Sequence, residues 1–177
     1  MQKHGNRQKK LMIIGVVKEI HHGERRVAMA PSVVKQCIKT GHSVLVEHGA
    51  GVIANFTDEQ YLDSGAEIVQ SAHKVWEQAD VILEISPAEK EIEEIEKVEE
   101  EENLETGRHE VDLICKDASL ICILSPRRNQ ELLKRLAKTG GNAIAVDAIP
   151  RITQAQSMDV LSSMANISGY LTHILFS

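Results

Sequence analysis

The sequence predicts an α/β fold in which helices cover both faces of a doubly wound, mostly parallel sheet, as in Rossmann-like and flavodoxin-like domains. Short aliphatic runs alternate with helical patterns along the chain, which is typical of this class. These runs are continuously apolar, as expected for parallel strands that are buried on both faces. At 177 residues, with 42% hydrophobic but only 3% aromatic residues, the chain is long enough for one domain with an aliphatic core.

Six aliphatic runs are the predicted strands. Because parallel strands of a doubly wound sheet end at one edge, we expect a ligand to bind outside their carboxyl ends. In chain order the runs occupy residues 11–17, 43–47, 67–69, 80–85, 119–124 and 142–146.

Helical patterns fill the intervals between the strands. Pro31 suits the first turn of a helix and Gly41 can end it. Thr57 and Gln60 have the spacing of a capping box, which predicts that a second helix follows Thr57. The four expected helices cover about 31–41, 58–64, 73–78 and 128–139.

Two segments stand outside this alternation, so the α/β domain is expected to span residues 11–164. Residues 1–10 are basic and contain no acidic residue. We expect a disordered tail there, with a remnant of an organellar transit peptide as the alternative. Residues 89–105 contain ten Glu and two Lys, so an acidic insertion over about 89–108 is expected to be mobile or poorly packed. The remainder is nearly neutral and gives no indication of nucleic-acid binding.

The stretch "GAGVIA", residues 49–54, has the G-x-G-x-x-A spacing of a dinucleotide-binding turn. Such a turn opens directly into a helix, whose N-terminus holds the pyrophosphate. Here the next helix is predicted only after Thr57, so residues 52–56 are expected to form a loop. We therefore interpret Gly49 and Gly51 as parts of a tight turn and not as a cofactor fingerprint.

Cysteines and histidines give no sign of a metal or disulfide framework. The cysteines Cys37, Cys115 and Cys122 form no C-x-x-C pair, and no secretory signal is visible. Reduced, buried thiols in an intracellular protein are therefore expected, with Cys122 in the core of a strand. The eight histidines lack metal-ligand spacing, so no metal site is predicted.

A first polar cluster, "KEIHHGERRVAMAP", follows the first predicted strand. A loop at this strand end would place Arg26 where it can bind a carboxylate or a phosphate. The alternative is a solvated loop in which an arginine pairs with Glu19 or Glu24.

A second polar cluster, "DAIPRITQAQSMDVLSS", follows the last predicted strand. Thr153 and Gln156 again have capping-box spacing, so a helix is predicted to begin near residue 154, just after Arg151. Gln156, Asp159 and Ser162 would then lie along one side of that helix. Helix capping with one exposed ion pair is the alternative interpretation.

These clusters also carry a resemblance. The stretches "IGVVKEIHHGERRVAMAPSVV" and "GHSVLVEHGAGVIANFTDEQY" resemble the amino-terminal region that is shared by alanine dehydrogenases and the NAD(H)-binding component of nicotinamide nucleotide transhydrogenase. The stretch "DAIPRITQAQSMDVLSSMANISGY" resembles the transhydrogenase branch. The resemblance covers about residues 11–172, apart from the acidic insertion. Val17 stands where the family usually has proline, and Ala30 where it has Thr or Ser.

The resemblance implies an NAD(P) transhydrogenase, in which hydride passes between NAD(H) and NADP(H) and is coupled to proton translocation in the full complex. Arg151, Gln156, Asp159 and Ser162 match the family's loop over the nicotinamide, so they are the implied catalytic and cofactor-binding residues. Gln156 would face the second nucleotide, which a partner domain carries. Direct hydride transfer is a positioning task, because two rings must meet with water excluded.

The resemblance also implies partners. These are a dinucleotide-binding domain that is absent from this sequence, reached through an interdomain helix beginning at about 165–177, and the membrane and NADP(H)-binding components of the complex. The implied location is the cytoplasmic side of a membrane or the mitochondrial matrix. An uncovered apolar stripe near the end of the sequence is expected to favour self-association as a homodimer. Its members are Tyr170, Leu171, Ile174, Leu175 and Phe176.

Two alternatives to transhydrogenase remain open. Alanine dehydrogenases use an Arg, a Lys and a His for their keto-acid substrate. Arg26 matches the Arg, but Ser86 and Ser125 stand at the places of the Lys and the His, which leaves no general acid–base pair. The second alternative is a non-catalytic, truncated assembly module. By itself, this chain is expected to fold as an α/β domain, to bind NAD(H) poorly and to transfer no hydride.

Overall fold

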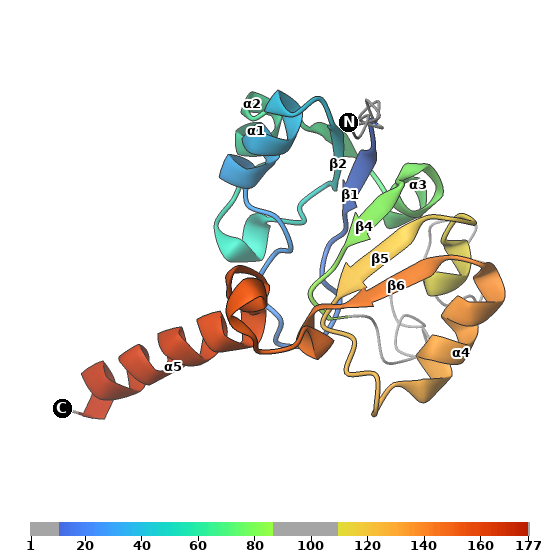
Figure 1. Ribbon diagram of the computed structural model, residues 1–177. Coiled ribbons are helices and arrows are strands. Elements are labelled where there is room, and N and C mark those ends of the chain that lie inside the picture. Colours follow the sequence, from blue (N-terminus) through green and yellow to red (C-terminus); the bar gives the residue numbers. More distant parts are fainter. Residues whose placement is uncertain (1–10, 87–109, 177) are drawn as a thin grey trace, which may run out of the picture.

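The computed structural model describes residues 11–86 and 110–176, and it contains a six-stranded parallel sheet with helices on both faces (Figure 1). The predicted fold class is confirmed. The expected basic tail, residues 1–10, and the expected acidic insertion, about 89–108, lie outside the described residues.

Each predicted aliphatic run contains one strand; β2 and β3 have the predicted bounds, and the other four strands are slightly shorter than their runs. The strands are β1 (Ile13–Val16), β2 (Ser43–Glu47), β3 (Glu67–Val69), β4 (Val81–Leu83), β5 (Ser119–Cys122) and β6 (Asn142–Ala145). They are arranged in the order β3-β2-β1-β4-β5-β6, and every neighbouring pair is parallel. The order reverses between β1 and β4, which pair directly through registers such as Ile14 opposite Val81.

The four predicted helices are present, and a fifth follows the last strand. The helices are α1 (Pro31–Lys39), α2 (Asp58–Asp63), α3 (Ala72–Gln78), α4 (Gln130–Thr139) and α5 (Val160–Phe176). The described residues also form four short 3₁₀ segments: η1 (Val52–Ala54), η2 (Glu110–Leu113), η3 (Val146–Ala148) and η4 (Thr153–Met158). The predicted capping box of Thr57 and Gln60 is formed at α2, and Gly140 ends α4 with φ +78°.

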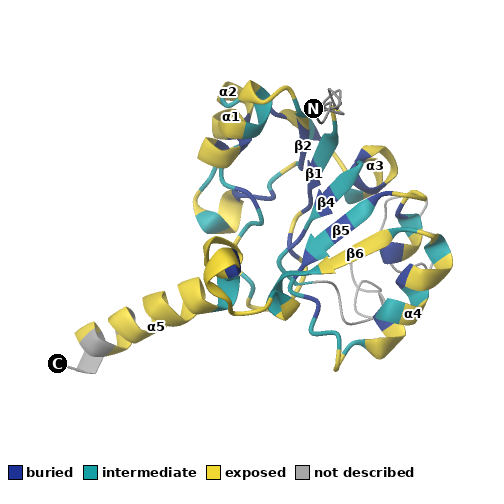
Figure 2. Ribbon diagram, viewed as in Figure 1, coloured by how far each residue is buried: buried dark blue, intermediate teal, exposed yellow. Residues whose placement is uncertain are grey.

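The sheet separates two apolar clusters. On one face, α3, α4 and η2 cover a core that contains the fully buried side chains of Trp76, Ile82 and Leu120. On the other face, α1 and α2 cover a core around Val46 and Tyr61. Figure 2 shows buried residues on β1, β2, β4 and β5, whereas the edge strand β6 is largely exposed. Burial on both faces explains why the strands are continuously apolar in sequence.

The glycine turn after β2 is structural. Gly49 has φ +72°, a left-handed conformation that favours glycine, and its N–H donates to Asp58 Oδ1 at 3.0 Å. A Cβ on Gly51 would lie 2.7 Å from Tyr61 Cε2 and 2.9 Å from the carbonyl oxygen of Phe56. The predicted loop 52–56 differs in one respect, because it contains the single 3₁₀ turn η1. This turn ends at the left-handed Asn55 and does not continue into a helix.

The cysteine prediction is only partly correct. Cys122 is buried in β5 as expected, whereas Cys37 is half-buried and Cys115 is exposed. The exposed Cys115 thiol donates a hydrogen bond to the Glu77 carbonyl oxygen at a distance of 3.0 Å. Burial raises the pKa of the Cys122 thiol, so it remains neutral.

Helix α5 projects away from the sheet (Figure 1). It begins at Val160, earlier than the expected interdomain helix at residues 165–177. Tyr170 and Ile174, two members of the expected apolar stripe, are 67% and 55% exposed. The side chains of the other three members lie outside the described residues, so self-association stays a prediction. Within the described part of the chain, no helix is long and apolar enough to cross a membrane.

We predict that Gly51→Ala destabilises the domain by about 1–3 kcal/mol, because its Cβ would press on the Phe56 backbone and the buried Tyr61 ring. Chemical denaturation of the parent and the variant measures the loss. Gly169→Ala in α5 is the matched control, since a Cβ there meets nothing within 4 Å, and it should be neutral or slightly stabilising. Equal effects of the two substitutions would contradict the steric explanation.

Candidate functional site

The candidate site lies at the edge of the sheet where the parallel strands end. The chain leaves β1 toward α1 on one face and leaves β4 toward η2 on the opposite face. Such a switch point is where α/β sheets bind ligands. Both predicted polar clusters begin at this edge, one after β1 and the other after β6.

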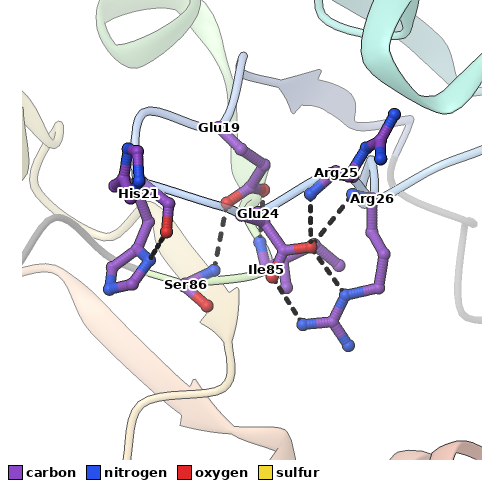
Figure 3. Close-up of polar contacts among 8 residues, drawn as sticks. Glu19, His21, Glu24, Arg25, Arg26, Ile85 and Ser86 are labelled. Carbon is purple, nitrogen blue, oxygen red and sulfur yellow. Dashed lines mark hydrogen bonds and ion pairs between the residues drawn. The ribbon is translucent and has the colours of Figure 1, made fainter.

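In the loop after β1, Glu24 holds Arg26 through the backbone and the side chain (Figure 3). Glu24 Oε1 accepts hydrogen bonds from the N–H groups of Arg25 and Arg26, at 3.0 and 2.9 Å. The Arg26 guanidinium donates from Nε to Oε1 at 2.7 Å and from Nη2 to Oε2 at 2.5 Å. Bonding to Arg26 lowers the pKa of the Glu24 carboxyl to about 2. Of the two partners that the sequence left open for Arg26, the structure therefore selects Glu24.

Glu19, the other acid in this loop, binds backbone instead. It is buried, and its carboxylate accepts the N–H of Ile85 at 2.6 Å and the N–H of Ser86 at 3.1 Å (Figure 3). Burial raises the pKa of Glu19, although these two hydrogen bonds act in the opposite direction. Glu19 thus fastens the loop after β1 to the segment that leaves β4.

Two further carboxylates join neighbouring strand ends in the same way. Glu47 at the end of β2 accepts the N–H of Lys18 at 2.7 Å. Asp147, just after β6, accepts the N–H groups of Leu124 and Ser125, both at 3.0 Å. Sequence analysis did not single out Glu47 or Asp147. The only local signal is an acidic residue at or directly after an apolar strand.

The predicted capping box in the second cluster is wrong, and so is the helix start near residue 154. Thr153 and Gln156 lie in the 3₁₀ segment η4, where no side chain caps the first turn. The α-helix begins at Val160, and Asp159 caps it. Asp159 Oδ1 accepts the N–H of Ser162 at 3.0 Å, and Oδ2 accepts the Ser162 hydroxyl at 2.5 Å.

Three of the four predicted site residues in this cluster come together. Arg151 Nε lies 4.0 Å from Asp159 Oδ2, so Arg151, Asp159 and Ser162 form one polar group. The Arg151 side chain is 71% exposed and that of Asp159 is 10% exposed. Gln156 does not share a helix face with them, because it precedes α5. Its side chain is exposed, and its carbonyl oxygen accepts the Asp159 N–H at 3.3 Å.

Arg26 lies in a separate loop with its own partner, Glu24. The two serines that we expect at the Lys and His positions of alanine dehydrogenases are engaged through their backbones. Ser86 donates its N–H to Glu19 and Ser125 donates its N–H to Asp147. Across residues 11–86 and 110–176, no group of three or more His, Cys, Asp or Glu side chains has a geometry that could hold a metal ion.

Comparison with known proteins identifies relatives for most of the chain. The family described as alanine dehydrogenase/PNT, N-terminal domain, matches residues 15–168. The chain is 40% identical to the NAD(P) transhydrogenase subunit alpha of Cereibacter sphaeroides over 159 residues, which are 90% of this chain and 27% of that protein. It is also 40% identical to an alanine dehydrogenase of Methanococcus maripaludis over 161 residues, which are 91% of this chain and 38% of that protein.

Solved structures agree with these relatives. The crystal structure of transhydrogenase from Sinorhizobium meliloti superposes with a TM-score of 0.73 at 34% identity, covering 89% of this chain and 40% of that one. The chain therefore spans between about a quarter and two fifths of the length of the relatives it matches.

We predict that Asp159→Ala weakens the start of α5 by about 0.5–2 kcal/mol, because the Ser162 N–H loses its acceptor. Hydrogen exchange of the Ser162 amide measures the loss as faster exchange. Gln156→Ala is the matched control, since the structure assigns it no capping bond, and it should leave that exchange rate unchanged. Faster exchange in Gln156→Ala would restore the capping box that the sequence suggested.

We further predict that the Glu24–Arg26 pair survives mild acid. A lowered carboxyl pKa means that the pair is complete above the usual value of 4.5 and is lost only as the pH falls through about 2. The Nε–H resonance of Arg26 should therefore stay constant from about pH 6 to about pH 3.5. Glu24→Gln should shift this resonance at every pH. A titration of the parent resonance near 4.5 would show that the pair is not formed in solution.

Proposed function

Because the chain belongs to the alanine dehydrogenase/PNT N-terminal domain family, we propose that it works as the amino-terminal part of an NAD(P) transhydrogenase. In this role it serves hydride transfer between NAD(H) and NADP(H), coupled to proton translocation in the full complex. The observation that carries the proposal is the polar group of Arg151, Asp159 and Ser162 beyond the end of β6. These residues, with Gln156, match the family's nicotinamide loop.

The chemistry of this polar group fits the nicotinamide end of a dinucleotide. A carboxamide needs hydrogen-bond donors and acceptors, and the exposed guanidinium of Arg151 and the exposed amide of Gln156 offer both. NAD(H), when bound, supplies or accepts the hydride. The contribution of these residues is to hold the ring in one orientation, which is the main requirement for direct transfer.

Asp159 acts on orientation through its neighbours. Its two oxygens are held by Ser162, and Oδ2 faces the Arg151 guanidinium at 4.0 Å. Hydrogen bonding to Ser162 lowers the pKa of Asp159, so the carboxylate stays charged opposite Arg151. A fixed anion beside a long, exposed cation restricts the directions that Arg151 samples, which favours one placement of the nicotinamide.

The pyrophosphate and adenosine need other partners. The glycine turn at residues 49–54 is filled by Tyr61, Phe56 and Asp58 and does not open into a helix. We therefore assign the rest of the dinucleotide to a separate dinucleotide-binding domain, and NADP(H) to a further component of the complex. By itself the chain is expected to bind NAD(H) weakly.

Alanine dehydrogenase is the competing function, and overall identity does not separate the two, since one relative of each kind is 40% identical. The discrimination comes from individual positions. Ser86 and Ser125 replace the Lys and His that the alanine dehydrogenase branch uses, so no side chain there supplies the acid–base chemistry of amino-acid oxidation.

A chimera tests the proposal. This chain replaces the equivalent amino-terminal region of the Cereibacter sphaeroides transhydrogenase alpha subunit, and single-turnover hydride transfer is measured together with NADH affinity. We expect Gln156→Ala to slow transfer tenfold or more with little change in affinity, as for a group that only positions the reacting ring. Asp159→Asn should slow transfer as well, because asparagine keeps the helix cap but loses the charge that faces Arg151.

Ser157→Ala, an exposed neighbour in η4, is the matched control and should transfer at the parent rate. Parent rates in Gln156→Ala and Asp159→Asn would refute the assigned roles. Oxidation of alanine by the chimera, or a chimera that binds both nucleotides but never transfers hydride, would favour the alanine dehydrogenase and assembly-module alternatives respectively.

A further inference from the structure

Glu84 is a buried carboxyl group without a complete set of partners. It directly follows β4 and remains on the sheet ladder, since its N–H donates to the Ile121 carbonyl oxygen at 3.2 Å. The residue is only 4% exposed, and its Oε1 has no hydrogen-bond partner in the described structure. A buried polar atom that is left unpaired costs free energy, so its presence calls for an explanation.

The position of Glu84 in the strand explains its burial. Side chains alternate between the faces of a strand, so Glu84 shares a face with Ile82, which is fully buried in the core beneath α3, α4 and η2. The neighbouring strand contributes the buried Cys122 to the same core. This carboxyl group therefore lies in largely apolar surroundings.

Among the described residues, the charged groups that act on Glu84 are also carboxyls. Glu19 faces it from the loop after β1 and Glu110 faces it from η2, while the neutral thiol of Cys122 lies nearby on β5. Burial, followed by the charges of Glu110 and Glu19, raises the pKa of Glu84 well above its usual value. Burial also raises the pKa of Glu110, to about 7. None of these groups supplies a cation that would stabilise an ionised Glu84.

We propose that Glu84 is a proton-binding group that keeps the end of β4 packed against Glu19 while it carries its proton, and that loosens this junction when it ionises. The connection is short, because Glu84 immediately precedes Ile85 and Ser86, the two residues whose N–H groups bind Glu19. An ionised Glu84 would be drawn toward water and would carry these N–H groups with it.

The junction leads directly to the Glu24–Arg26 loop. Glu19 lies five residues before Glu24 on the same connection from β1 to α1. Loss of the Glu84 proton therefore releases the base of the loop that presents Arg26. This inference concerns the fold and the loop, and it is independent of the proposed role in hydride transfer.

The direction of the pH dependence follows from the raised pKa. A carboxyl that binds its proton more tightly in the folded state contributes stability that is complete below its unfolded pKa of about 4.5. The contribution is lost as the pH rises through the folded value. Glu110 acts in the same direction, and its contribution is lost between about pH 4.5 and about pH 7.

Glu84→Gln is the test, because glutamine has the size of the protonated carboxyl and cannot ionise. In urea unfolding of the full chain, the ratio of folded to unfolded parent should fall as the pH rises from about 5 to about 9. In Glu84→Gln the same ratio should fall less than in the parent, by a factor of ten or more, since each unit of pKa shift corresponds to a factor of ten. Glu67→Gln, an exposed glutamate in β3, is the matched control and should follow the parent.

Two readouts separate protonation from a merely structural role. Infrared spectroscopy at neutral pH should detect protonated carboxyls in the parent and in Glu67→Gln. In Glu84→Gln the band should lose the part that Glu84 contributes and keep only the part due to Glu110, whose pKa is about 7. Hydrogen exchange of the Ile85 and Ser86 amides, compared at one alkaline pH, should be faster in the parent than in Glu84→Gln.

Three results would overturn the proposal. The first is destabilisation of Glu84→Gln by the same factor at every pH, and the second is a carboxyl band that the substitution leaves unchanged. The third applies if Glu84→Gln does not fold. The parent is then labelled with ¹³C-glutamate, and a finding that no glutamate carboxyl is protonated at neutral pH would overturn the proposal.

Discussion

The ends of the parallel strands depend on one repeated interaction, a carboxylate at one strand end that accepts backbone N–H groups from the next. Glu47 joins β2 to Lys18, the second residue after β1. Glu19 joins the loop after β1 to the segment after β4, and Asp147 joins the turn after β6 to the segment after β5. Where strands diverge into loops, the sheet ladder no longer satisfies these N–H groups, and buried N–H groups need acceptors. The three carboxylates meet this need, and they also fix the loops that carry Arg26 and lead to Arg151.

This solution concentrates negative charge at the edge of the sheet. Glu19, Glu47, Glu84 and Glu110 all have raised pKa values, with burial as the largest cause in each case. The backbone hydrogen bonds of Glu19 and Glu47 oppose the shift, whereas Glu84 and Glu110 have no such compensation. Arg26, one of the cations of the β1 loop, pairs with Glu24 nearer the surface. Charge at this edge is thus balanced partly by N–H dipoles and partly by protons, which makes its geometry sensitive to solution conditions.

Much of the fold was predictable because its signals are local. Continuous apolar runs gave the strands, and the Thr57–Gln60 spacing gave a true capping box. The same spacing at Thr153 and Gln156 was misleading, since Asp159 and Ser162 offer a competing cap six residues later and local sequence does not rank the two. The sequence did not decide between Glu19 and Glu24 as the partner of Arg26. Glu19 accepts N–H groups that lie 66 and 67 residues away along the chain, and no local pattern indicates these contacts. Burial of Glu84 did have a signal, because a strand places it on the same face as Ile82.

The cap at Asp159 has a mechanical meaning as well. Helix α5 contains 17 residues, so it is about 25 Å long at 1.5 Å per residue, and it leaves the body of the domain with few contacts other than those near its first turn. A tilt of about 10° at the cap therefore displaces the far end by roughly 4 Å over that length. The hydrogen bonds between Asp159 and Ser162 therefore help to set the direction of α5, and a small change of angle at this cap becomes a large displacement at the far end of the helix.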